Sequence, residues 1–141
     1  MRLYLAGIQG RGWCLDLYMA GNMRGTKGRW FEDDRDRLLG IGEDKIDVAI
    51  LESFYYADEW TERIIPKTKR FLLDSGAFTF FSSGKSVDWN GYLKRYIDFI
   101  NKNNVEKFFE LDIDPLVGYV KVLEFRRILE ENTGKRCIPV W

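Results

Sequence analysis

The sequence predicts an α/β protein built from repeating strand–helix units. Short apolar runs rich in β-branched and aromatic residues alternate with longer stretches whose apolar residues recur every three or four positions. Such alternation favours parallel strands joined by right-handed helical crossovers. The pattern leaves two architectures open, a doubly wound open sheet and a (β/α)8 barrel. No Gly-x-Gly-x-x-Gly follows any expected strand, which disfavours a dinucleotide-binding open sheet.

The first 52 residues predict a short strand and a clearer one, separated by a stretch with weaker signals. A short apolar run at 3–6 stops at Gly7 and predicts the first strand. Residues 8–45 fit a helix, a basic loop and a short helix at 13–20, 24–29 and 33–39. The run at 47–52 is almost uniformly apolar at its centre, as strands covered on both faces are.

The middle of the chain predicts helix, strand and helix. Residues 57–65 form the first helix, which Pro66 ends, and residues 70–74 form a strand. Residues 89–102 give the strongest helix signal, with Asp88 as its N-cap. One apolar stripe runs along it: Trp89, Tyr92, Leu93, Tyr96, Ile97 and Ile100.

The last third predicts strand, helix and strand. A strand at 107–113 precedes Asp114-Pro115, which places aspartate at a helix cap and proline at the first helical position. That helix runs to about residue 131, and a final strand covers 136–140. Because a full barrel needs roughly 250 residues, we expect residues 1–141 to be one α/β domain that forms the N-terminal part of a larger barrel. The alternative is a complete five-stranded domain.

Composition excludes several kinds of active site. The chain has 22 basic and 22 acidic residues and no histidine, so neither a Ser-His-Asp triad nor His-ligated zinc is available within it. Its two cysteines, Cys14 and Cys137, have no metal-site spacing. No apolar run approaches the roughly 20 residues of a membrane span, and the N-terminus is not a signal peptide. We therefore expect a cytoplasmic protein with no membrane partner.

Carboxylates follow the expected strands at the ends where α/β proteins bind ligands. Asp74 ends one strand, Glu52 ends the strand before it, and Glu110 and Asp112 lie in the strand after it. Alternation predicts that Glu110 and Asp112 share one face with Phe108, which points inward in a barrel. Because buried carboxylates are costly, they indicate a site. For Glu110, an internal ion pair with lysine or arginine is an equal alternative.

The segment 74–78 is the clearest candidate site. Ser75 and Gly76 are small enough for a ligand to approach the backbone, and Phe78 offers a flat face for stacking. The alternative is an ordinary turn closed by an aspartate hydrogen bond. The residues alone do not separate the two interpretations.

Two runs resemble motifs of the tRNA-guanine transglycosylases, which are (β/α)8 barrels that exchange guanine for a 7-deazaguanine such as queuine. The run Leu73-Asp74-Ser75-Gly76-Ala77-Phe78 is similar to their Asp-Ser-Gly-Gly-aromatic-Gln motif. The run Phe108-Phe109-Glu110-Leu111-Asp112 is similar to a later strand that ends in a base-recognising aspartate. Residues 47–141 resemble the family loosely, and their overall sequence pattern is most similar to that of short phage-type members.

The resemblance implies a role for each candidate residue. Asp74 would be the catalytic general acid/base or a carboxylate that contacts the base. Ser75 and Gly76 would shape the base pocket, Phe78 would stack on the base, and Asp112 would accept its hydrogen bonds. Ala77 stands where the family has glycine and Thr79 where it has a base-contacting glutamine, which leaves the identity of the base open. The family's nucleophile and zinc site belong to the later part of its barrel, so this segment needs no cofactor or metal of its own.

Three functions follow as hypotheses. The first is base exchange in tRNA or phage DNA, with a guanine-like or 7-deazaguanine base as ligand and the host cytoplasm as location. The second is a nucleoside or glycoside hydrolase that uses paired carboxylates. The third is a non-catalytic partial barrel that binds a completing subunit or a second copy of itself.

Overall fold

The computed structural model describes residues 4–6, 46–81 and 87–140, and its contacts divide the chain into two compact units. The first unit comprises residues 1–52 and 57–71, and the second comprises residues 53–56 and 72–141. The helices expected at 13–20 and 33–39 and the loop at 24–29 lie outside the described residues.

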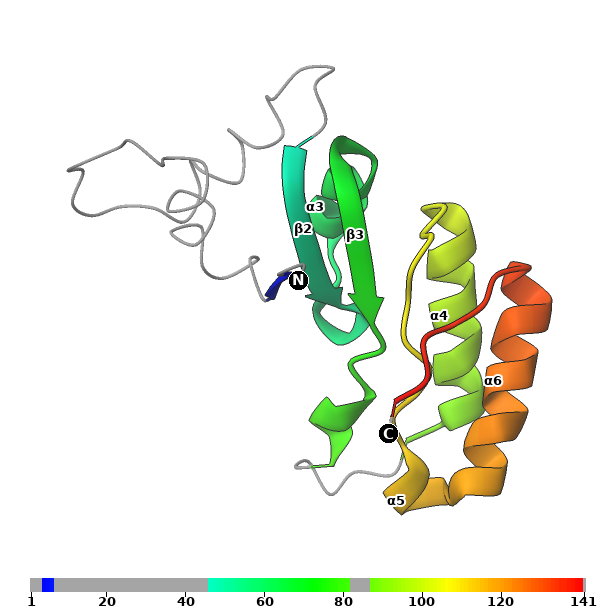
Figure 1. Ribbon diagram of the computed structural model, residues 1–141. Helices are drawn as coiled ribbons and strands as arrows, with labels where there is room; N and C mark the ends of the chain where they lie inside the picture. The colour runs from blue at the N-terminus through cyan, green and yellow to red at the C-terminus, as the bar shows by residue number, and fades with distance from the viewer. Residues whose placement is uncertain (1–3, 7–45, 82–86, 141) are drawn as a thin grey trace. The chain divides into compact units, whose positions relative to one another are not determined.

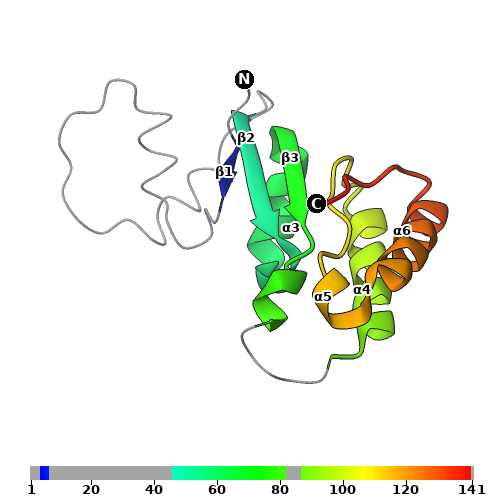
Figure 2. The same ribbon diagram turned by 60° about the horizontal axis from the view of Figure 1, so that its bottom comes forward.

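Three strands form a sheet whose order is β1-β2-β3, and most of their residues belong to the first unit (Figures 1 and 2). Strand β1 covers Leu5–Ala6, β2 covers Ile46–Ser53 and β3 covers Thr68–Asp74. β1 and β2 are parallel, with Leu5 opposite Ile50. All three expected strands of this region are present, and the buried Ile50 and Phe71 contribute to the core.

Helix α3, Glu59–Ile64, forms where the sequence predicts a helix. Asp58 caps it in a capping box, in which its carboxylate accepts from Thr61 N at 3.0 Å. Pro66 does not end the helix abruptly, because a 3-10 turn, Ile65–Lys67, follows and contains it. Trp60 is buried on the helix.

The second unit is built on two helices that lie side by side, α4 (Trp89–Lys102) and α6 (Tyr119–Thr133) (Figure 1). Helix α4 has the predicted bounds and the predicted cap, since the Asp88 carboxylate accepts from Gly91 N at 3.0 Å. Its buried residues are the predicted stripe without Trp89: Tyr92, Leu93, Tyr96, Ile97 and Ile100.

The single helix expected from Asp114 to about residue 131 is wrong. Gly118 has φ +81° and separates a short helix α5, Asp114–Val117, from α6. Ile113 is the N-cap of α5, so Asp114 stands in the first turn and is not a capping residue. Gly134 ends α6 in the left-handed conformation, as the sequence predicts.

The strands expected at 107–113 and 136–140 are extended segments that make single bridges instead of ladders. Leu73 pairs with Phe108 and Phe109 pairs with Ile138, both in parallel. The outer side of the last segment offers little for a longer ladder, because Cys137 N–H donates to the Glu130 carboxylate at 3.2 Å and Pro139 has no N–H.

The described residues thus form a mixed α/β structure, and within each unit the strands and segments that pair are neighbours in sequence. The pairs β1–β2, Leu73–Phe108 and Phe109–Ile138 are all parallel. Within the described parts of the chain, no helix has the length and apolarity needed to cross a bilayer.

Candidate functional site

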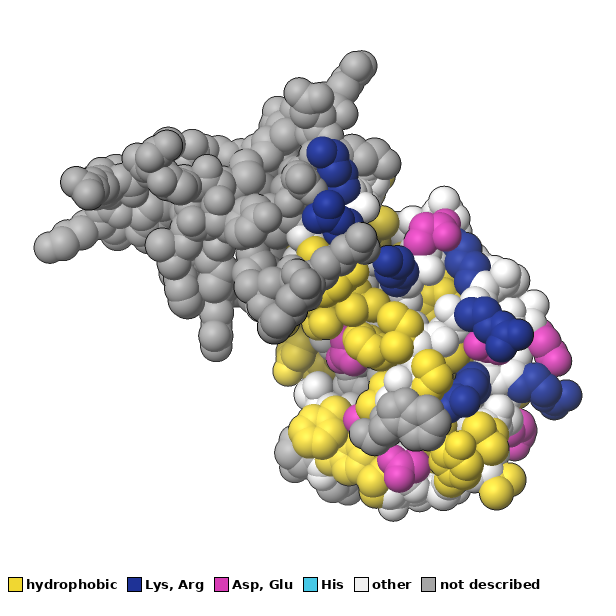
Figure 3. All heavy atoms as spheres, viewed as in Figure 1, with side chains coloured by type: hydrophobic (Ala, Val, Ile, Leu, Met, Phe, Trp, Pro, Cys, Tyr) yellow, Lys and Arg dark blue, Asp and Glu magenta, His cyan; other side chains and the backbone are white. Residues whose placement is uncertain are grey.

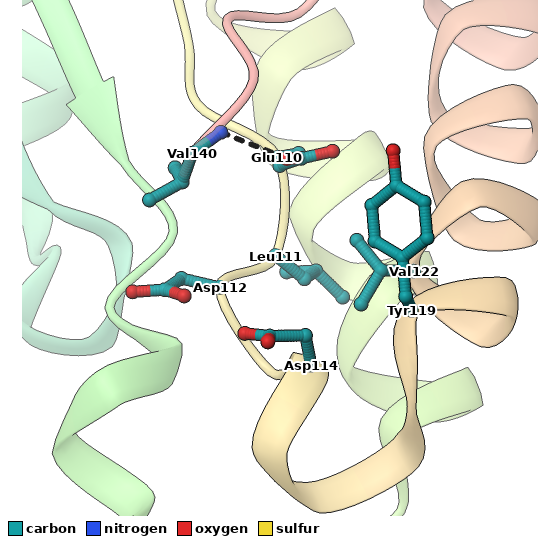
Figure 4. A pocket seen from close by; sticks show the side chains of 7 residues that line it. All are labelled: Glu110, Leu111, Asp112, Asp114, Tyr119, Val122 and Val140. Carbon is teal, nitrogen blue, oxygen red and sulfur yellow. Dashed lines mark hydrogen bonds between the residues drawn. The ribbon is translucent and has the colours of Figure 1, made fainter.

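A pocket of about 190 Å³ opens in the second unit where the segment after Phe109 meets the start of α6 (Figure 4). Three carboxylates stand in its wall together with apolar side chains and one phenol. The lining residues are Glu110, Leu111, Asp112, Asp114, Tyr119, Val122 and Val140. Two predicted site residues, Glu110 and Asp112, therefore line one cavity.

The turn after Asp74 is closed by hydrogen bonds from backbone N–H groups to side chains two residues earlier. The Asp74 carboxylate accepts from Gly76 N at 3.0 Å, and the Ser75 hydroxyl accepts from Ala77 N at 3.3 Å. Ser75 is almost fully buried, at 1% exposure. Because these bonds stay within the turn, they match the ordinary-turn interpretation for its backbone.

Gly76 is required by the chain's own packing. Its φ is +69°, and a Cβ there would stand 2.5 Å from Tyr55 Cβ and 2.7 Å from Tyr55 N. The space expected for a ligand beside Gly76 is thus filled by the segment that follows β2. A ligand contact from Ser75 or Gly76 stays a prediction.

Burial raises the pKa of Asp74 above its usual value, and the hydrogen bond from Gly76 works in the opposite direction. The pKa of Asp112 is also raised, first by burial and then by the negative charges of Asp114, Asp74 and Glu110. The structure therefore brings the two motif aspartates, Asp74 and Asp112, within electrostatic reach of each other.

Glu110 forms the internal ion pair that was the alternative to a site. It is 2% exposed, and its carboxylate accepts from Arg126 of α6 at 2.5 Å and 3.0 Å and from Val140 N at 2.8 Å. Both carboxylate oxygens thus have protein donors, which favours a structural role. Contact between Glu110 and a substrate stays a prediction.

The expectation that Glu110 and Asp112 share one face is wrong. Glu110 points towards α6, whereas Asp112 points to the opposite side of the segment (Figure 4). Strict alternation requires a regular strand, and the regular pairing stops at Phe109. Phe108 is directed at α4, where its ring meets Tyr96 edge-on at 6.4 Å.

Phe78 is the most exposed of the predicted site residues. Its side chain lies on the 3-10 turn Ala77–Phe80 and is 71% exposed, with the Phe81 ring 5.2 Å away. Such exposure leaves most of the aromatic surface open to a ligand. Stacking on a base is compatible with this position and stays a prediction.

Sequence patterns missed three polar groups that organise the site. No sequence pattern singles out Arg126, and the apolar stripe of α4 includes Tyr92 and Tyr96 without assigning a role to their hydroxyls. Tyr92 OH donates to Ser75 O and Tyr96 OH to Leu73 O, which are the carbonyls on the two sides of Asp74. Tyr96 OH also bonds Phe109 O. Tyrosine in place of phenylalanine on a buried stripe is the signal that could have identified them, because a buried hydroxyl needs a partner.

Metal ligands do not gather in the part of the chain that the structure describes, where no group of three Cys, Asp or Glu residues could hold an ion. Cys137 is a free thiol whose pKa is raised to about 12, mainly by burial. Glu52, the minor candidate, is buried at the end of β2 in the first unit.

Comparisons with known proteins do not assign the site. No family model matches the chain, and no match was found among the curated proteins or among the solved structures. The chemistry of the site residues themselves is therefore the basis for a function.

Proposed function

We propose that this chain binds a guanine-like base and takes part in base exchange at a glycosidic bond, as tRNA-guanine transglycosylases do. One observation carries the proposal. Asp74 and Asp112 come from the two motifs that resemble this family, and the charge of Asp74 contributes to the raised pKa of Asp112. Two separate sequence signals thus meet at Asp112, which lines the pocket and whose pKa the charge of Asp74 helps to raise.

The pocket chemistry suits a planar base with two adjacent N–H donors. An ionised carboxylate can accept hydrogen bonds from both donors at once. In the proposed complex, Asp112 would bind the two adjacent N–H groups of guanine in this way. Leu111, Val122 and Val140 supply apolar surface for the ring. At about 190 Å³ the pocket is smaller than the roughly 300–1,000 Å³ of typical small-molecule sites, which favours a single base over a whole nucleotide.

Asp74 is the candidate general acid/base. A carboxyl with a raised pKa keeps its proton closer to neutral pH than an exposed aspartate does, and can give it to a departing base. In the exchange, the bond between the base nitrogen and the anomeric carbon breaks and its electron pair leaves with the base. A carboxylate oxygen forms the new bond to that carbon until the incoming base displaces it.

The arrangement of the sheet supports barrel-type winding for this chain. In a doubly wound open sheet the strand order reverses at a switch point, whereas a (β/α)8 barrel keeps sequential neighbours adjacent throughout. The parallel pairs β1–β2, Leu73–Phe108 and Phe109–Ile138 keep the sequential order. A partial barrel of five strands is the form we propose.

The proposed acceptor is a nucleic acid, tRNA or phage DNA, which would present its base to the pocket. Basic, acidic and hydrophobic side chains are intermixed on the face seen in Figure 3. Carboxylates around the pocket repel phosphates, so the base must enter and the backbone must stay outside. We therefore expect recognition to depend on the base more than on phosphate contacts.

Base binding is the first test. Titration calorimetry with guanine and with 7-deazaguanine is expected to show binding to the wild-type chain. In Asp112→Asn the affinity should fall about tenfold or more, because a charge-assisted hydrogen-bond pair is lost. Asp98→Asn changes an exposed aspartate of α4 and should bind as the wild type does. No binding to the wild type, or equal affinity in both variants, contradicts the proposal.

Labelled guanine separates exchange from the other functions. Incorporation of label into tRNA or DNA supports exchange, and release of base without incorporation indicates a hydrolase. The hydrolase is a real second candidate, since a carboxyl with a raised pKa beside another carboxylate is the usual acid/base arrangement of such enzymes. Base binding with neither reaction indicates a non-catalytic module.

A further inference from the structure

Two tyrosines on one face of α4 donate hydrogen bonds to the backbone carbonyls on both sides of Asp74 and to that of Phe109. Tyr92 and Tyr96 stand one helical turn apart and are 4% and 0% exposed. Tyr92 OH donates to Ser75 O at 2.6 Å, and Tyr96 OH lies 3.3 Å from Leu73 O and 3.0 Å from Phe109 O. The two phenols therefore reach the carbonyls on both sides of Asp74.

Backbone hydrogen bonding between β3, which ends at Asp74, and the segment that carries Asp112 ends at Leu73 and Phe109. Leu73 N donates to Lys107 O at 3.0 Å, and Phe109 N donates to Leu73 O at 2.9 Å. Among the residues that the structure describes, this is the last backbone hydrogen bond between β3 and the segment that carries Asp112. The ladder thus stops one residue before Asp74 and three residues before Asp112.

The Tyr96 hydroxyl adds a side-chain bond at the last pair of this ladder. Its hydroxyl has one proton, which it shares between the Leu73 and Phe109 carbonyls, one from each segment. Burial raises the pKa of Tyr96 well above its usual value, so the phenol keeps that proton at every physiological pH. The ring itself is fixed by packing against Phe54 and Phe108, with centroids 5.1 Å and 6.4 Å away.

We propose that Tyr96 is a positioning residue, whose hydroxyl sets the spacing between the strand end that carries Asp74 and the segment that carries Asp112. Tyr92 acts in the same way on the turn that follows Asp74, through the Ser75 carbonyl. Helix α4 thereby holds the carboxylate pair in register without contacting a ligand. The role of that spacing in base binding rests on the proposed function, but the spacing itself does not.

The test uses the full chain and reads the aspartates directly. In Tyr96→Phe the ring and its packing remain and only the hydroxyl is lost. The Asp112 carboxyl, followed by NMR through a pH titration, should then titrate at a lower pH than in the wild type, because it moves away from Asp74 and gains water. Tyr92→Phe should shift Asp74 more than Asp112.

Ile100→Val is the matched control. It removes one buried methylene group from the same face of α4, so it lowers stability without touching a hydroxyl. Its Asp112 titration should match the wild type. The proposal is overturned if Tyr96→Phe leaves the Asp112 titration unchanged, or if Ile100→Val shifts it equally.

Base affinity gives a second and separable readout. If the wild type binds guanine, Tyr96→Phe should weaken that binding about tenfold, since small displacements of a recognition group are costly. Equal affinity in Tyr96→Phe and wild type counts against the positioning role. If the wild type binds no base, the proposed function fails, and the titration still decides the role of Tyr96.

Discussion

At the scale of single residues, Gly76 is the position where backbone and packing demand the same amino acid. Its φ of +69° disfavours any side chain, and a Cβ would meet Tyr55 Cβ at 2.5 Å and Tyr55 N at 2.7 Å. Gly76→Ala should therefore lower the free energy of unfolding by about 2 kcal/mol or more, from strain and overlap together. Urea denaturation followed by circular dichroism measures the change.

Gly134→Ala is the matched control for that prediction. Gly134 has nearly the same φ, +67°, yet a Cβ there meets no atom within 4 Å. This variant should lower the free energy of unfolding by about 1 kcal/mol, because only its backbone conformation is unfavourable. Equal losses in the two variants would show that the close approach to Tyr55 contributes nothing.

At the scale of elements, the last extended segment is attached to α6 through two carboxylates, of which Glu110 is buried and Glu130 is half-buried. Glu110 accepts from Arg126 and from Val140 N, and Glu130 accepts from Cys137 N. Arg126→Met leaves the Glu110 charge buried without its partner. We expect a loss of about 2–3 kcal/mol, below the 3–5 kcal/mol of fully buried pairs, because the Arg126 side chain is 22% exposed.

Two further variants complete the Arg126 test. Arg127→Met removes the guanidinium of the next residue, whose side chain is 70% exposed. This variant should change the free energy of unfolding by less than about 0.5 kcal/mol. Adding Glu110→Gln to Arg126→Met removes the unpaired charge and should restore part of the loss. A double variant whose loss is the sum of both single losses would argue against coupling.

The elements also show which parts of the fold were predictable. Helix α4 was predicted with its cap and its bounds, because its apolar period and Asp88 agree. The break at Gly118 was missed, since one glycine inside a helical pattern is usually tolerated. The segment at 107–113 was predicted as a regular strand, which it is not. Periodicity does not reveal that Phe109 O accepts from the Tyr96 hydroxyl, or that Val140 N donates to the Glu110 carboxylate, where a regular ladder would pair backbone groups.

For the candidate site, the structure shows where the predicted residues lie, and their roles stay predictions. Asp74 and Asp112 were both identified from motifs, and the structure brings them within electrostatic reach. Glu110 was identified as buried, but its partner Arg126 lies on a helix whose register against the segment no local pattern specifies. Side chains that act through long-range contacts are therefore the ones that sequence reasoning missed.

At the scale of the whole molecule, the raised pKa of Asp112 makes stability depend on pH. A carboxyl with a higher pKa in the folded state binds its proton more tightly there than in the unfolded chain. Stability therefore falls as pH rises from the unfolded value, near 3.8, through the higher folded value, and the penalty persists at neutral pH. Burial is the main cause of the raised pKa of Asp112, followed by the negative charges of Asp114, Asp74 and Glu110.

Asp112→Asn should then stabilise the chain at pH 7 and lose that advantage below pH 3.8, where the wild-type carboxyl is protonated in both states. Urea denaturation at both pH values measures the effect, with Asp98→Asn as the exposed control. The same variant is expected to bind a guanine-like base more weakly. A residue whose removal raises stability and lowers binding has been kept for function, so destabilisation at pH 7 would instead make Asp112 a structural residue.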